Sequence, residues 1–203
     1  MAKSKDTTEE KILNAAKEVF MKYGLYGSRM HDIADTAGIN KALLHYYFRS
    51  KEKLFDTVFS GALHKYLQQM DAFLDSSLPI RQRLNNYVDN VFSFLEEYPQ
   101  MPVFIIKEVS INPELFRDRV DVLKKDKGIS IIQVLEKEIE LGTIRKMDTA
   151  LFLINLHSLC SYPFLAAPIF KHVLKANHKN WEEYSPAKIK QSVKQFIERT
   201  LLS

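Results

Sequence analysis

Apolar residues recur every three or four positions along most of the chain, a spacing typical of amphipathic α-helices. The first such stripe comprises Ile12, Leu13, Ala16, Val19, Phe20 and Tyr23. Thr7 and Glu10 have the spacing of an N-terminal capping box, and Gly24 favours a helix end. The pattern therefore predicts a helix over residues 8–23, followed by a turn, with Ser28 as the N-cap of the next helix.

Two short helices around a tight turn follow. Gly38 ends the first, because glycine adopts the left-handed conformation at no steric cost, and Asn40 caps the second. The inner faces comprise Ile33, Ala34 and Ala37, then Leu44 and Phe48, whereas the outer face of the second helix carries Lys41, Ala42, His45 and Tyr46. A short helix that exposes such side chains at a fixed angle to its neighbour fits a DNA major groove. The pattern thus indicates a helix-turn-helix.

The remaining helices are predicted from apolar spacing and from breaks at proline and glycine. They run from about 51 to 73, from 80 to 95, from 103 to 111, from 113 to 142, from 149 to 162, on from Pro163 to about 175, and from 186 onward. Pro163 is expected to kink or restart its helix, and a polar loop is expected over 178–185. Since alternating β patterns are scarce, the fold class is expected to be all-α.

Composition narrows the class of protein. The 203 residues are 46% hydrophobic and 27% charged, which is ordinary for a globular chain. No run of eighteen apolar residues occurs, so no membrane segment is expected, and the N-terminus is too polar for a signal peptide. The single cysteine, Cys160, cannot form an intrachain disulfide. These features predict a cytoplasmic protein.

Charge supports nucleic-acid binding only locally. The net charge is +4, spread over the chain, but residues 37–53 carry Lys41, Arg49, Lys51 and Lys53 against Glu52 alone, a local +3. A basic surface of this kind suits phosphate contacts. Taken alone, it is equally well an ordinary solvated face.

The segment from Ile33 to Phe55, IADTAGINKALLHYYFRSKEKLF, resembles the DNA-binding signature of TetR/AcrR-family transcriptional regulators, and the helix from Lys11 to Gly24 matches as well. The resemblance covers about the first sixty residues. It implies an N-terminal three-helix DNA-binding domain over residues 1–53 and a C-terminal helical ligand-binding and dimerisation domain over residues 54–203. It further implies a homodimer on a near-palindromic double-stranded DNA operator.

By position, the resemblance places the following residues at DNA: Ser28, Arg29, Asn40, Lys41, Ala42, His45, Tyr46, Tyr47 and Lys51. Leu43 stands where threonine or serine is common, and His45 where tyrosine is common. These differences concern which operator is recognised, because leucine cannot hydrogen-bond a base or phosphate.

Lys51 opens a helix, where the helix dipole disfavours a cation by roughly 0.3–1 kcal/mol. A DNA phosphate would reverse that sign, since it meets both the ammonium and the free N–H groups. The alternative is that the adjacent Glu52 offsets the lysine locally. The phosphate interpretation is the stronger one because of the surrounding motif.

In the C-terminal part, aromatic, sulfur-bearing and polar residues are candidates for an effector cavity: Tyr66, Met70, Tyr87, Phe92, Met101, Phe104, Asn155, His157 and Cys160. At helical spacing, most of these are also ordinary core residues. Asn155 and His157 either orient a ligand or face a dimer seam. Segments 148–175 and 186–202 carry enough apolar surface for a four-helix seam with a second copy.

The sequence therefore predicts a DNA-binding transcriptional regulator, a repressor released from its operator by a small, largely apolar effector. The alternative is a small-molecule binding protein with a vestigial DNA unit. We expect no enzyme: no nucleophile elbow, P-loop, dinucleotide motif or paired-acid constellation occurs. No catalytic residue, metal ligand, cofactor or membrane partner is predicted.

Overall fold

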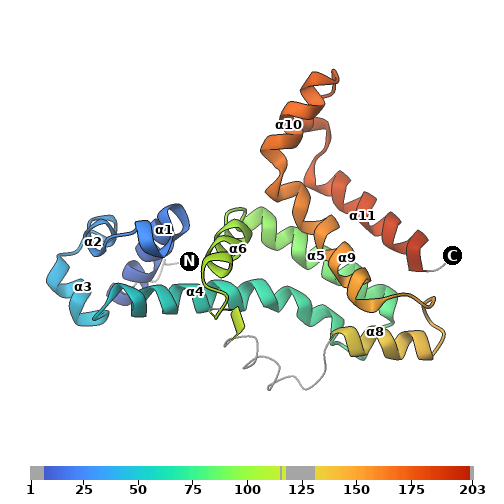
Figure 1. The fold of residues 1–203 in the computed structure, drawn as a ribbon, viewed down its shortest axis with the longest axis horizontal. Coiled ribbons are helices and arrows are strands. Elements are labelled where there is room, and N and C mark those ends of the chain that lie inside the picture. Colours follow the sequence, from blue (N-terminus) through green and yellow to red (C-terminus); the bar gives the residue numbers. More distant parts are fainter. Residues whose placement is uncertain (1–6, 115, 118–130, 202–203) are drawn as a thin grey trace, which may run out of the picture. The chain divides into compact units, whose positions relative to one another are not determined.

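A computed structural model describes residues 7–114, 116–117 and 131–201 (Figure 1). Every regular element within these ranges is helical, and no strand occurs among them, so the all-α prediction is confirmed. Backbone packing divides the chain into two compact units. Unit 1 comprises Met1–Lys65 and Val103–Arg119, whereas unit 2 comprises Tyr66–Pro102 and Val120–Ser203.

Helix α1 (Thr8–Gly27) begins with the predicted capping box. The Glu10 amide donates to Thr7 Oγ1 at 3.2 Å, and the Thr7 amide donates to the Glu10 carboxylate at 2.7 Å. This bonding lowers the pKa of Glu10. Gly24 interrupts the helix with φ 72° and ψ −178°, and one further turn continues to Gly27. The sequence located this break correctly, although a helical turn replaces the expected loop.

Helices α2 (Met30–Ala37) and α3 (Lys41–Tyr47) form the predicted helix-turn-helix. Gly38 is left-handed at φ 66°, and the Asn40 side chain accepts from the Leu43 amide at 2.8 Å, as expected. The cap predicted at Ser28 is wrong. Arg29 occupies the N-cap position, and the Ser28 hydroxyl instead donates back to the Gly24 carbonyl at 2.6 Å.

The core of unit 1 is built from α1, α2, α3, the first part of α4 (Lys51–Gln68) and most of α6 (Met101–Ile111). Phe55 and Phe59 stack at 5.7 Å, and the Phe104 ring meets both edge-on at 6.0 and 5.8 Å. Other fully buried side chains include Ile12, Phe20, Ile33 and Leu44. Aromatic packing therefore fixes α6 against the N-terminal helices.

Unit 2 contains a 3₁₀ turn, η1 (Gln69–Phe73), and the helices α5 (Ile80–Glu97), α8 (Ile131–Glu140), α9 (Thr149–Leu165), α10 (Ala167–Ala176) and α11 (Pro186–Leu201). Asp89 on α5 pairs with Lys190 at 3.3 Å and with Lys194 at 2.6 Å, both on α11. The middle of the helix predicted over 113–142 lies outside the described residues, and its end is α8, with Gly142 at φ 70°.

Pro163 does not break its helix where expected. Helix α9 continues to Leu165, and the chain then bends by 74° at Ala166 into α10. The predicted polar loop at 178–185 contains a short 3₁₀ turn, η2 (Trp181–Glu183). Phe170 on α10 stacks on Trp181 with 6.0 Å between the ring centres, which ties η2 back to α10.

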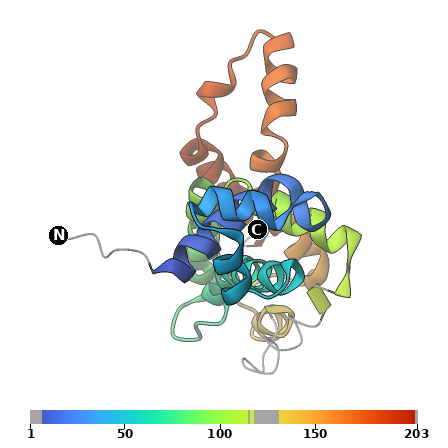
Figure 2. The same ribbon diagram turned by 90° about the vertical axis from the view of Figure 1, so that its left-hand side faces the viewer.

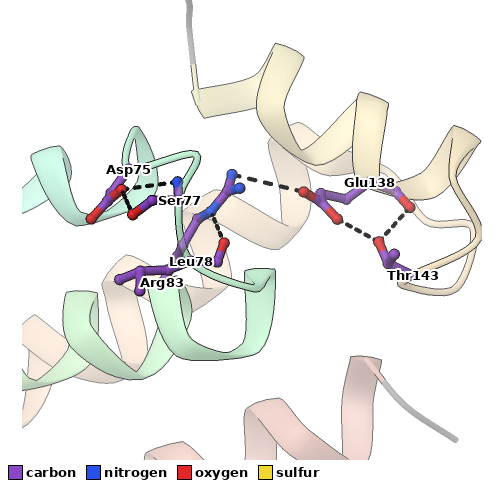
Figure 3. Close-up of polar contacts among 6 residues, drawn as sticks. All are labelled: Asp75, Ser77, Leu78, Arg83, Glu138 and Thr143. Atoms are coloured by element: carbon purple, nitrogen blue, oxygen red, sulfur yellow. Dashed lines mark hydrogen bonds and ion pairs between the residues drawn. The ribbon is translucent and has the colours of Figure 1, made fainter.

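A buried ion pair between Arg83 and Glu138 joins α5 to α8 (Figure 3). The local sequence pattern did not predict it. Arg83 Nε donates to the Leu78 carbonyl at 2.7 Å, and its guanidinium lies 3.7 Å from Glu138. The two side chains are only 10% and 12% exposed. The other Glu138 oxygen accepts from the Thr143 hydroxyl at 2.5 Å. The arrangement satisfies both charges, as buried ions require.

The sequence predicts a division of the chain by function, into a DNA-binding domain over residues 1–53 and a ligand-binding and dimerisation domain over residues 54–203. The two compact units show only which helices pack together, so this functional division stays a prediction. Among the described residues, no single helix is long and apolar enough to cross a membrane. The α9–α10 pair meets the criteria of length and composition only when taken together, across its bend.

Candidate DNA-binding surface and effector site

Helix α3 presents a polar and aromatic face to solvent over a buried anchor. Leu44 is 0% exposed, whereas Lys41, Ala42 and His45 are exposed and Tyr46 is 80% exposed. The ring of Tyr46 meets that of Tyr47 edge-on at 5.5 Å. Figure 2 views the molecule from the side of α2 and α3. This face has the size and chemistry that a major groove admits.

The turn before α2 and the first turn of α4 lie together. Arg29 is exposed, and the half-buried Lys51 donates from Nζ to the Ser28 carbonyl at 3.1 Å. Lys51 therefore has a structural partner that sequence reasoning missed. That partner is neutral, so the ammonium charge is not compensated there and donors remain for a phosphate.

Seven of the nine residues predicted at DNA are exposed: Arg29, Asn40, Lys41, Ala42, His45, Tyr46 and Tyr47. The side-chain oxygen of Asn40 already accepts the capping hydrogen bond from the Leu43 amide. Ser28 is different, since it is 2% exposed and its hydroxyl bonds inside α1. Its side chain is a structural tie within α1, so a direct DNA contact through the Ser28 hydroxyl does not fit this geometry.

A polar cluster lies inside unit 2, formed by Tyr66 from the end of α4, Tyr87 from α5 and His157 from α9. The Tyr66 hydroxyl is 2.6 Å from His157 Nε2, and the Tyr87 hydroxyl is 2.6 Å from Nδ1. Burial lowers the pKa of His157 and raises the pKa of Tyr66 to about 12. A neutral imidazole then donates to one tyrosine and accepts from the other.

Apolar and sulfur-bearing groups surround this cluster. Phe94 lies edge-on to Tyr66 at 5.9 Å, and the nearby thiol of Cys160 is fully buried. Burial also raises the pKa of Cys160 to about 12. The pKa of Tyr87 is raised as well, mainly by burial and further by the nearby Cys160 and Tyr66. Phe94 lies two helical turns from Tyr87 on one face of α5, a spacing that places both residues on the same side of the helix.

The other residues predicted to line an effector cavity lie in different parts of the structure. Phe92 and Met101 are buried in unit 2, where Phe92 meets Phe164 at 5.3 Å, and Met70 is half-buried. Phe104 instead belongs to the core of unit 1, so it does not join the Tyr66 cluster. Asn155 is exposed on α9 and points away from the interior. In the described part of the chain, no group of three metal-binding side chains is placed to hold an ion.

Comparison with known proteins gives the same picture. Residues 12–58 match the model of the family described as bacterial regulatory proteins, tetR family. The transcriptional regulator YttP of Bacillus subtilis is 28% identical over 175 residues, covering 84% of this chain and 83% of YttP. The transcriptional activator FasR of Mycolicibacterium smegmatis is 27% identical over 163 residues, covering 74% of each chain.

Solved structures share the fold over nearly the whole length. The TetR-family regulator PfmR of Thermus thermophilus superposes with a TM-score of 0.68 at 19% identity, covering 98% of both chains. A transcriptional regulator from Saccharomonospora viridis, solved in complex with choline, has a TM-score of 0.66 at 20% identity and covers 95% of this chain and 96% of its own. With its capped α2–α3 pair and exposed α3 face, this chain belongs to the TetR family and is a helix-turn-helix DNA-binding transcriptional regulator.

Proposed function

We propose that the protein is a homodimeric repressor that binds a near-palindromic operator and is released from it by a small, largely apolar effector. The observation that carries the DNA part is the exposed face of α3 over the buried Leu44. Two such helices, one from each copy, would enter successive major grooves about 34–36 Å apart.

The proposed contacts fall into two classes. Lys41, His45 and Tyr46 face base edges, whereas Arg29, Tyr47 and Lys51 hold phosphates. Asn40 and Ala42 line the start of α3, where close approach of the backbone to the groove favours small side chains. Ser28 contributes through its backbone carbonyl, which accepts the hydrogen bond from Lys51.

Fluorescence anisotropy with the DNA that flanks the protein's own gene tests this assignment. Lys41→Ala and Lys51→Ala should each weaken binding, and Lys51→Ala should lower the slope of log affinity against log salt by about one. Lys146→Ala is the matched control, because Lys146 is exposed in unit 2 and its loss changes the net charge equally. Equal effects of Lys51→Ala and Lys146→Ala would contradict the proposed contacts.

The dimer seam is proposed on α9 and α11. Leu151, Ile154 and Tyr162 are 58%, 60% and 54% exposed, and at 100° per residue they share one side of α9 with Asn155 and Ser158. Phe196 on α11 is 53% exposed as well. An apolar stripe of this kind on a regulator is best explained by a second copy.

Sedimentation velocity at micromolar concentration tests the seam. The wild type should sediment as a dimer and Leu151→Glu with Ile154→Glu as a monomer. Ile106→Glu is the control, because Ile106 is 50% exposed but lies on α6 in unit 1. A monomeric wild type would overturn the proposal.

The effector is proposed to lie in unit 2 beside Tyr66, Tyr87 and His157. One neutral imidazole between two hydroxyls offers few hydrogen bonds in apolar surroundings, so the matching ligand is largely apolar with one small polar group. Thermal shifts with a set of apolar acids, amines and alcohols, followed by anisotropy with operator DNA, test this. A true effector stabilises the protein and weakens operator binding, because it favours one of the two states.

The direction of regulation needs its own measurement, since one relative is named an activator. Deleting the gene should raise expression from an operator-linked reporter if the protein represses. A double variant addresses the alternative of a vestigial DNA unit: Tyr47→Ala combined with Lys51→Ala should abolish operator binding and leave effector affinity unchanged.

A further inference from the structure

A buried carboxylate reaches α1 at its bend. Glu108 on α6 is only 2% exposed, and its Oε1 accepts a hydrogen bond from the Leu25 amide at 3.3 Å. Leu25 follows Gly24, whose non-helical dihedral angles interrupt the regular bonding of α1. A buried carboxylate is costly unless its oxygens are bonded, so its presence here calls for a specific role.

The bend leaves no room for a side chain. Gly24 has φ +72°, and a Cβ atom at this position would lie 2.6 Å from Glu108 Oε1. Glycine is therefore required twice, by its backbone conformation and by the closeness of the carboxylate. Glu108 and Gly24 form a matched pair, although they lie far apart in the chain.

From this pair, hydrogen bonds lead to the proposed DNA surface. The Gly24 carbonyl accepts from the Ser28 hydroxyl at 2.6 Å, and the Ser28 carbonyl accepts from Lys51 Nζ at 3.1 Å. Arg29, the next residue, is the N-cap of α2. All of these residues lie in unit 1, so one connected set of bonds joins α6, the bend of α1, the α1–α2 turn and the first turn of α4.

We propose that Glu108 is a positioning residue for operator binding: by accepting from Leu25 at the Gly24 bend, it fixes the turn that carries Arg29 and that offers the Ser28 carbonyl to Lys51. This rests on the proposed DNA contacts of those two residues. Glu108 itself touches no DNA in this scheme and acts through backbone geometry.

Two substitutions separate the hydrogen bond from packing. Glu108→Gln keeps an oxygen acceptor of the same length, whereas Glu108→Met keeps the length and removes the acceptor. Glu108→Met should weaken operator binding about tenfold, because a hydrogen bond to a charged group is strong, and Glu108→Gln should restore most of it. The exposed Glu97 on α5 gives the control, since Glu97→Met changes the net charge equally.

The salt dependence provides a readout that general destabilisation does not move. If Glu108 acts through Lys51, then Glu108→Met should lower the slope of log affinity against log salt by about one, as Lys51→Ala does. The double variant should be scarcely weaker than Lys51→Ala alone. Circular dichroism establishes that each variant is folded, and Glu108→Ala replaces Glu108→Met if the latter is not.

The outcomes are distinct. A wild type that binds no operator overturns the proposed function and this inference with it. A wild type that binds while the folded Glu108→Met variant binds equally well, with an unchanged salt slope, overturns the positioning role alone. Equal losses in Glu108→Gln and Glu108→Met would also overturn it, because the glutamine still offers the acceptor.

Discussion

The Tyr87 hydroxyl and His157 Nδ1 lie 2.6 Å apart inside unit 2, and Tyr66 occupies the other ring nitrogen at the same distance. Tyr87→Phe would leave that nitrogen buried without a partner. We expect this change to lower the free energy of unfolding by about 1–3 kcal/mol, measured by urea titration. Tyr162→Phe, at a 54% exposed residue, should change it by less than about 0.5 kcal/mol.

The same histidine predicts a pH dependence. Burial lowers the pKa of His157 in the folded state, so below its ordinary value of 6.5 the unfolded chain binds the proton more readily. The contribution of His157 to the free energy of unfolding should therefore be fully present above about pH 6.5. It should decrease as the pH falls from there through the folded-state pKa. Urea titrations from pH 7.5 to 5, compared with His157→Gln, isolate this contribution. Parallel profiles for the two proteins would contradict it.

The two arginines at the start of α5 should behave very differently. Arg83→Met strands the buried Glu138, and we expect a loss of about 3–5 kcal/mol in the free energy of unfolding. Arg81→Met removes a pair with Glu198 whose partners are 59% and 47% exposed, so a change of about 0–1 kcal/mol is expected. Similar losses in the two variants would contradict the assignment of Arg83 as a buried anchor.

Two glycines with open surroundings separate backbone strain from packing. Neither Gly38 nor Gly61 has an atom within 4 Å of an added Cβ, but only Gly38 has a positive φ, +66°. Gly38→Ala should destabilise by about 1–2 kcal/mol, whereas Gly61→Ala, within α4, should stabilise by about 0.5–1 kcal/mol. Thermal unfolding of both variants measures the difference, and a stabilising Gly38→Ala would show that the turn conformation differs.

The sequence predicted most reliably what neighbouring residues decide. The capping box at Thr7, the left-handed Gly38 and the Asn40 cap all involve partners within four positions, so the chain itself carries the signal. The helix-turn-helix was predictable for the same reason. The exposed face of α3 followed from the helical spacing around Leu44.

What the sequence missed at Phe104 and Glu108 came from contacts between distant segments, whereas the error at Ser28 is local, because Gly24 lies only four positions before it. Ser28 is a good N-cap residue in isolation, but the bend at Gly24 brings a carbonyl within reach of its hydroxyl. Phe104 was taken for a cavity residue because nothing local shows that α6 packs on Phe55 and Phe59. Glu108 bonds to a residue 83 positions away, which no periodicity can indicate.

The stack of Phe170 on Trp181 has a practical consequence for spectroscopy. Trp181 is the chain's single tryptophan, and its ring stacks on Phe170 of α10 rather than on the Phe55, Phe59 and Phe104 rings of unit 1 or on the Tyr66–Phe94 pair of unit 2. Emission excited selectively from tryptophan therefore reports one segment of the molecule. A fluorescence change during titration with effector or DNA would record rearrangement of that segment. Loss of the whole fold would be followed better by far-ultraviolet dichroism.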